Sequence, residues 1–205
     1  MSMTIALDAI RLDALKEVGN VGAGHAMTSF ATMLDRMVNM SVPHVGIMEL
    51  HQFVEVAGGA ESLTVGVYMP VMGDAPGHIA FLFPYHTACE VADTLLGNPV
   101  GETTELDEMS GSVFMEVGNI LASSFLIALC EMTGLDLRSS PPALAVDMTV
   151  SILSSIAAAF DNIEEDIVTI VTQIEEGDGN MEGYFIFVPE PGSLKIVLRA
   201  LGLEE

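Results

Sequence analysis

The alternation of hydrophobic and polar positions predicts long helices combined with short strands. Two stretches keep apolar residues at helical spacing over many turns, so we expect long helices at about 8–37 and 107–135. Shorter apolar runs bounded by turn residues predict strands at 44–50, 63–71, 77–83, 143–148, 166–175 and 183–188. Further helical patterns lie near 85–97, at 149–161 and after Pro191. The pattern at 149–161 has no predicted counterpart in the first half and is interpreted as an insertion.

An internal repeat relates the two halves of the chain. Residues 7–43 align without a gap with residues 106–142, at an offset of 99 residues. The sequence Glu-Val-Gly-Asn occupies 17–20 and again 116–119. The other identities pair Leu7, Asp8, Ala23, Met33, Ser41 and Pro43 with Leu106, Asp107, Ala122, Met132, Ser140 and Pro142. Four consecutive identities among ten matches indicate a duplication rather than chance.

The duplication determines the expected fold. One long helix over a few strands is too thin to bury a sheet alone, so the two halves should share a core. We therefore expect a single domain over residues 1–205, of the α/β (α+β) class, with two repeats at about 7–99 and 106–203. In this pseudo-twofold domain both long helices pack on a β-sheet. The turn-rich stretch 97–101 is the expected joint between the repeats.

Matching residues are also expected to mark the ends of the two long helices. Asp8 and Asp107 are suited to cap the helix N-termini, because an Asp side chain can accept a hydrogen bond from an unpaired N–H of the first turn. Pro43 and Pro142 are expected to end the connection from helix to strand, because proline disfavours helix at the preceding residue.

Composition excludes several classes of function. The chain has 205 residues, 50% of them hydrophobic, with 6 Lys and Arg against 29 Asp and Glu and a net charge of −23. Such acidity disfavours nucleic acids and anionic membranes as partners. No apolar run approaches the roughly 20 residues of a membrane span, and no basic leader precedes the domain, so we expect a cytoplasmic protein. Cys89 and Cys130 are interpreted as buried structural thiols, and the scattered His residues predict no metal site.

The repeated helix places its polar residues on one stripe. Asp13, Glu17 and Asn20 share a face of the first helix, and Ser112, Glu116 and Asn119 occupy the corresponding places on the second. One turn further, the stripe reaches the small residues Gly24 and Ser123, which would let another protein dock closely. Asp13 and Ser112 are either contacts at the docking edge or plain polar positions, and the second interpretation is slightly favoured.

Two further residues of the repeat allow two interpretations. Gly19 and Gly118 each place a glycine inside a helix, at a cost of about 1 kcal/mol relative to alanine. Either close packing on a strand underneath or close approach by a partner could offset that cost, and the sequence does not separate the two.

A single Glu-x-x-Asn pair on an exposed helix is usually only solvated, but two identical copies are not explained that way. The spacing Asp/Ser-x3-Glu-x2-Asn-x22-Pro, found in both halves, resembles the signature of the CheC/FliY/CheX phosphatase family. CheX has one such motif per subunit, and FliY carries an additional flagellar-switch domain. With two motifs in one chain, the sequence is most similar to the CheC branch of this family.

The resemblance implies a phosphatase of chemotaxis and two-component signalling. Asn20 and Asn119 would orient a water that attacks the aspartyl-phosphate of the response regulator CheY, and Glu17 and Glu116 would pair with the regulator's lysine. Asp13, Ser112, Gly24 and Ser123 would contact the partner. The chain would hold no metal, since Mg²⁺ would belong to CheY, and it would work as a monomer.

Two alternatives to this phosphatase stay open. One is a non-catalytic adaptor that binds CheD or sequesters phosphorylated CheY. The other is an acidic domain that binds a small molecule in a pocket between the halves and is indifferent to both Asn residues.

The few basic residues suggest that the two motifs are unequal. Arg11 and Lys16 are close in sequence to the first motif, whereas the second helix has no Lys or Arg before Arg138. We therefore expect the two sites to differ in affinity for an acidic response regulator.

Overall fold

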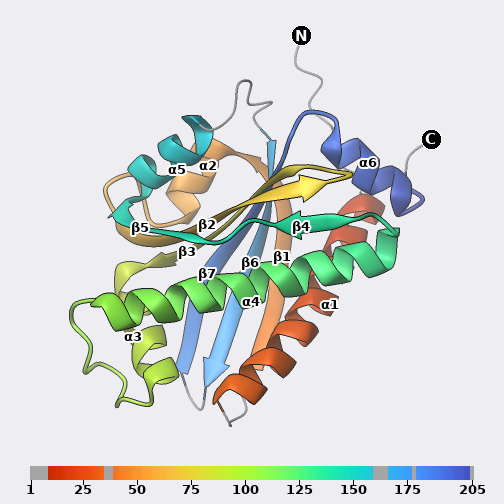
Figure 1. Ribbon diagram of the computed structural model, residues 1–205. Helices are drawn as coiled ribbons and strands as arrows, with labels where there is room; N and C mark the ends of the chain where they lie inside the picture. The colour runs from red at the N-terminus through yellow and green to blue at the C-terminus, as the bar shows by residue number, and fades with distance from the viewer. Residues whose placement is uncertain (1–8, 35–38, 159–165, 177–178, 204–205) are drawn as a thin grey trace.

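Two segments of the chain build the same order of elements, except that two strands of the second segment stand where the first has one (Figure 1). The structure, a computed structural model, describes residues 9–34, 39–158, 166–176 and 179–203. The first segment contains α1 (Ala9–Leu34), β1 (Asn39–Glu49), α2 (Leu50–Val56), β2 (Leu63–Gly73), β3 (Gly77–Pro84) and α3 (Tyr85–Leu96). The second contains α4 (Glu108–Thr133), β4 (Leu137–Ser139), β5 (Ala143–Met148), α5 (Thr149–Ala158), β6 (Asp166–Glu176), β7 (Gly179–Pro189) and α6 (Ser193–Ala200). Both long helices have 26 residues, and their starts lie 99 residues apart (108 minus 9), the offset of the sequence repeat.

The two segments interleave in one antiparallel sheet. Its strands follow the order β1-β6-β7-β3-β2-β4, and β5 also pairs with β2. The central pair joins β3 to β7, and each segment's first strand lies at an edge against the other segment, β1 on β6 and β4 and β5 on β2. Exchanging the two segments swaps β2 with β6 and β3 with β7 and gives the same strand order read from the opposite edge. The predicted α+β class with pseudo-twofold arrangement is therefore confirmed. The repeat limits at about 7–99 and 106–203 stay a prediction.

Side chains cover both faces of the sheet. On the central strand β3, Ile79, Phe81 and Phe83 belong to the core under α1 and α4, while Ala80 and Leu82 belong to a second core under α2 and α5. This alternation follows from the two-residue period of a strand. Figure 1 shows α1 and α4 side by side across one face of the sheet.

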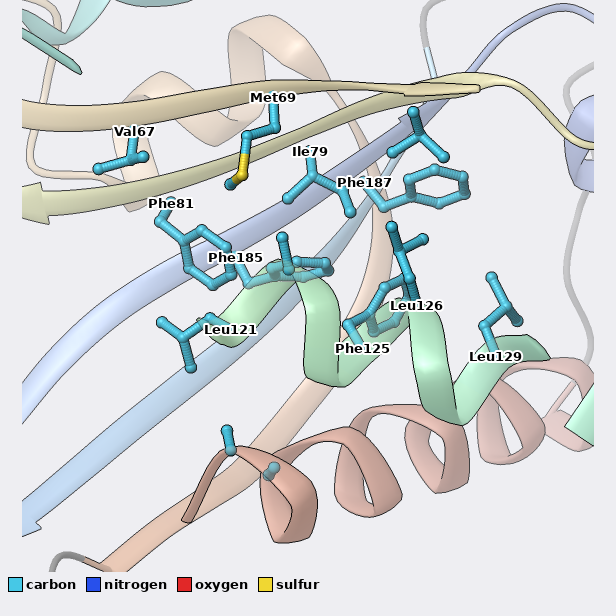
Figure 2. Close-up of a cluster of buried hydrophobic side chains, with 14 of the residues drawn as sticks. Val67, Met69, Ile79, Phe81, Leu121, Phe125, Leu126, Leu129, Phe185 and Phe187 are labelled. Atoms are coloured by element: carbon cyan, nitrogen blue, oxygen red, sulfur yellow. The ribbon is translucent and has the colours of Figure 1, made fainter. Parts of the chain in front are cut away.

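Aromatic side chains fix the orientation of α4 on the sheet (Figure 2). The ring centroid of Phe125 lies 4.6 Å from that of Phe185, which lies 4.8 Å from that of Phe81. Each such pair contributes about 0.5–1.5 kcal/mol beyond the burial of its area. Where α1 passes α4, a Cβ on Gly22 of α1 would lie only 3.0 Å from Cα of Phe125. Glycine therefore permits the close approach of the two long helices.

Asp107 caps α4 as predicted. Its side chain accepts a hydrogen bond from the Ser110 backbone N–H at 2.9 Å, and Gly134 ends the helix in the left-handed conformation. This bond and a second one from the Ser110 hydroxyl hold the pKa of Asp107 below its ordinary value. The corresponding Asp8 lies outside the described residues.

The helix predicted at 149–161 forms as α5, but its interpretation as an insertion is wrong. The short helix α2 occupies the matching place, because Leu50 and Thr149, their first residues, are 99 positions apart. No helix or strand was predicted between residues 50 and 63. A helix of seven residues has too few turns to show a helical spacing of apolar residues. In the structure, Phe53 of this helix is fully buried.

The repeated prolines lie at strand irregularities, so the prediction that they end the connection from helix to strand is wrong. Pro43 lies inside β1, where the register against β6 shifts between Ser41 and His44. Pro142 lies between β4 and β5, both of which pair with β2. Proline has no N–H to donate to a ladder, so the edge strand is irregular in one copy and divided in the other.

A buried carboxylate holds the connection between α3 and α4. The side chain of Asp93 is fully buried and accepts backbone hydrogen bonds from Gly101 at 2.8 Å, Glu102 at 3.0 Å and Thr103 at 3.0 Å. Burial raises the pKa of Asp93, but these bonds and one from the Thr103 hydroxyl outweigh it, so the pKa lies below its ordinary value. The turn-rich stretch is therefore tied to α3.

Two expectations from composition are modified by the structure. By length and composition, α4 could cross a membrane, but 56% of its most apolar 18-residue window is buried, as in the core helix of a folded domain. Cys89 is a buried free thiol as predicted, whereas Cys130 is only partly buried.

Candidate active site on two helices

The first Glu/Asn pair lies on the outward face of α1. The side chains of Asp13, Glu17 and Asn20 are exposed, and Gly24 one turn further is half-buried. Val18, on another face of the helix, is fully buried in the core between α1 and the sheet. The stripe predicted from the sequence therefore faces away from the sheet.

The second pair occupies the same position on α4. Ser112, Glu116 and Asn119 are exposed, Ser123 is half-buried, and Val117 is buried in the core. On each helix the Glu and the Asn are three residues apart, so their Cβ atoms are about 5–6 Å from each other. Each pair can therefore reach into a single pocket of a docked protein.

Neither pair is engaged by the rest of the described chain. Within residues 9–34, 39–158, 166–176 and 179–203, the side chains of Glu17, Asn20, Glu116 and Asn119 form no hydrogen bond or ion pair. Ser112 differs, because its hydroxyl donates to the carbonyl oxygen of Glu108 at 3.0 Å. This bond supports the interpretation of Ser112 as a plain polar position of its helix.

The glycines of the motif have different roles. A Cβ on the buried Gly118 would lie 2.4 Å from Cγ1 of Val67, so packing on β2 explains this glycine. Gly19 is also buried. A Cβ on Gly24 would meet nothing within 4 Å, which leaves the surface beside the first pair open.

The basic residues near the first pair are placed differently from each other. Lys16 is exposed, whereas Arg11 is half-buried and its Nε donates to the carbonyl oxygen of Leu203 at 3.1 Å. Arg11 therefore ties the start of α1 to the residues that follow α6. Sequence reasoning missed this contact, because it joins positions 192 residues apart.

The comparisons with known proteins agree with this geometry. A sequence profile of the CheC-like family matches residues 10–47, which include the first Glu/Asn pair. The chain is 31% identical over 206 residues to the CheY-P phosphatase CheC of Bacillus subtilis (strain 168), covering 98% of this chain and 99% of that protein. The chain belongs to the CheC-like family.

Solved structures share the fold of this CheC-like chain. FliY of Thermotoga maritima matches with a TM-score of 0.80 and 22% identity, over 98% of this chain and 100% of that chain. A CheX in complex with CheY, BeF3 and Mg²⁺ from Borrelia burgdorferi matches with a TM-score of 0.50 and 20% identity, over 82% and 96%. The resemblance to the CheC/FliY/CheX family is confirmed.

Exposed apolar residues share the face of α4 that carries the second pair of this CheC-like protein, and they were not singled out from the sequence. Met109 is 62% exposed, Ile127 is 48% exposed, and Met115 lies at the edge of the stripe. At 100° per residue, Met109 and Ile127 each fall about 20° from Glu116, so helical periodicity alone could have found them.

The structure also has a cavity away from the two Glu/Asn pairs. A cavity between β2, β3, β5 and α5 has residues of both segments in its wall, among them Tyr68, Ala80, Ala145 and Ile156. It borders the core under α5, on the face of the sheet opposite both Glu/Asn pairs. Over the described ranges, no group of three or more His, Cys, Asp or Glu side chains is arranged to hold a metal ion.

Proposed function

We propose that this CheC-like protein is a phosphatase that removes the phosphoryl group from the aspartyl-phosphate of the chemotaxis response regulator CheY. The observation that carries the proposal is the pair of outward-facing, unengaged Glu/Asn constellations at matched positions of α1 and α4. The name of the Bacillus subtilis relative and the CheX–CheY complex among the structures of this fold support it.

The reaction needs a positioned water more than a strong nucleophile. An aspartyl-phosphate is an activated acyl phosphate, and phosphoryl transfer is catalysed largely by positioning and electrostatics. The water oxygen attacks phosphorus as the bond to the aspartate oxygen breaks, giving inorganic phosphate and a free carboxylate. An amide can both accept from and donate to that water without attacking phosphorus itself, which suits Asn20 and Asn119.

The Glu residues have a supporting role in this proposal. Glu17 and Glu116 would pair with the lysine of the regulator's active site and so fix the depth at which each Asn enters. The Mg²⁺ that neutralises the phosphoryl oxygens would be held by CheY as part of the substrate. Asp13, Ser112, Gly24 and Ser123 would lie in the partner contact, with Gly24 leaving room for close approach.

The remaining assignments belong to the same proposal. The protein would act in the cytoplasm as a monomer, and CheD would be a second protein partner. The net charge of −23 favours protein partners over nucleic acids or anionic membranes.

The test is the loss of phosphoryl groups from phosphorylated CheY with Mg²⁺ present. Wild-type protein should accelerate this loss, and Asn20→Ala/Asn119→Ala should lower the acceleration by roughly 10²–10³-fold, as for other positioned polar groups. Asn98→Ala is a matched control, because Asn98 is an exposed amide in the joint between α3 and α4. If the wild-type protein does not accelerate the loss, alone or with CheD, the adaptor is favoured instead. If the wild-type protein is inactive and also does not bind phosphorylated CheY, the small-molecule domain is favoured.

A further inference from the structure

The basic residues of this acidic chain gather at one end of α1. Of the 6 Lys and Arg residues, Arg11 and Lys16 lie on α1 and Lys195 and Arg199 lie on α6. In the sequence these two pairs are about 180 residues apart. Their combination is therefore a property of the fold.

One hydrogen bond and a shared core place α6 near the start of α1. Arg11 donates to the carbonyl oxygen of Leu203, just after α6, at 3.1 Å. Val197 and Leu198 of α6 are buried in the same core as Val18 of α1. Figure 1 shows α6 beside the N-terminal end of α1.

The outer face of α6 is basic. With Val197 and Leu198 buried, Lys195 and Arg199 are exposed one helical turn apart, and Ile196 between them is 37% exposed. Lys195 forms no hydrogen bond or ion pair with any described residue. The positive charge of Lys195 is therefore available to a docking protein.

The second pair has the opposite electrostatic surroundings. Tyr85 of α3 accepts a hydrogen bond from the Leu106 backbone N–H at 3.2 Å, which places α3 and the joint beside the start of α4. That region contains the exposed Glu102, Glu105 and Glu108, and the sequence has no Lys or Arg between Arg36 and Arg138. Among the described residues, the second pair is therefore flanked by these glutamates, whereas the first pair has Lys16 and the basic face of α6 on its side.

We propose that Lys195 and Arg199 of α6, together with Lys16, form a cationic docking edge that attracts the phosphorylated regulator to the first pair only. This inference rests on the proposed function. A phosphoryl group adds about −1.5 to −2 charge to the regulator, which gives charge complementarity with this edge. A protein partner covers about 800 Å², a patch roughly 16 Å in radius, and Arg11 lies only about 9 Å along α1 from Glu17. A regulator centred on Glu17 and Asn20 therefore reaches the end of α6.

The two sites can be tested separately by silencing one at a time. Asn119→Ala leaves the first pair intact, and Asn20→Ala leaves the second. In the Asn119→Ala background, Lys195→Glu/Arg199→Glu should lower kcat/KM for phosphorylated CheY about tenfold at low salt, and the loss should vanish as salt shortens the Debye length below about 5 Å. In the Asn20→Ala background the same charge reversal should change kcat/KM less than twofold.

A matched control separates local from total charge. Lys195→Glu and Arg138→Glu alter the net charge equally, but Arg138 lies on β4 and pairs with Asp136, so only Lys195→Glu should affect the first site. Equal losses in both backgrounds, or none in either, would overturn the docking edge while the phosphatase stands. Absence of activity in wild-type protein would instead refute the proposed function, and the dissociation constant of each variant for phosphorylated CheY would then test the edge without turnover.

Discussion

The helices α1 and α4 present the same Glu/Asn pair in different surroundings. They have equal length and start at matched positions, yet Lys16 of α1 corresponds to Met115 of α4, and Thr28 corresponds to Ile127. The flanking helix also differs, because α6 beside α1 is basic on its outer face. The comparison teaches that one local geometry can be repeated while the surface that selects the partner varies around it.

The largest change in the free energy of unfolding is expected at Gly118, which packs on the sheet. Gly24, on the proposed docking surface, should behave differently. Gly118→Ala should lower the free energy of unfolding by about 1–3 kcal/mol, because the added methyl overlaps Val67 on β2. Gly24→Ala has free space and should raise it by up to about 1 kcal/mol through helix propensity. Urea unfolding of both variants measures the difference, and equal stabilities would contradict the packing role of Gly118.

A comparable or smaller effect is expected where the flanking helices are attached. Asp93→Asn should lower the free energy of unfolding at pH 7 by about 1–3 kcal/mol, because an amide cannot accept the same charge-assisted bonds from the joint. Arg11→Ala removes the bond to the carbonyl oxygen of Leu203 and should also lower the free energy of unfolding. Thermal unfolding of the two variants compares the attachments of α3 and α6.

The pH dependence of the Asp93 variant has a defined sign. The folded-state pKa of Asp93 is lowered, so its contribution to stability is complete above the unfolded-state pKa of about 3.9 and disappears as pH falls through the folded-state value. Wild type and Asp93→Asn should therefore differ most near neutral pH and converge in acid. A gap that stays constant down to pH 2 would contradict this assignment.

The long elements were predictable because their signals are local. Helix periodicity and the Asp107 cap placed α4 within two residues at each end, and the repeat placed α1 as well. The three-residue β4 is too short for any pattern, and β1 begins five residues before its predicted start. The basic edge formed by α6 could not be predicted, because it depends on tertiary contacts across nearly the whole chain.

The smallest expected effect concerns the apolar surface of the second site. Ile127→Thr gives α4 the residue found at the corresponding place of α1, and it should lower second-site kcat/KM about threefold to fivefold, or about 1 kcal/mol of lost apolar contact. The reduction should not depend on salt. Steady-state assays in the Asn20→Ala background measure it, and the Asn119→Ala background, in which this site is silent, should show no change.

The most direct measurement compares wild type, Asn20→Ala, Asn119→Ala and the double variant in dephosphorylation of CheY at low and high salt. We expect each single variant to retain part of the activity, the two to be unequal at low salt and closer at high salt, and the double variant to match CheY alone. A double variant that still accelerates the reaction would contradict the assignment of catalysis to the two Glu/Asn pairs.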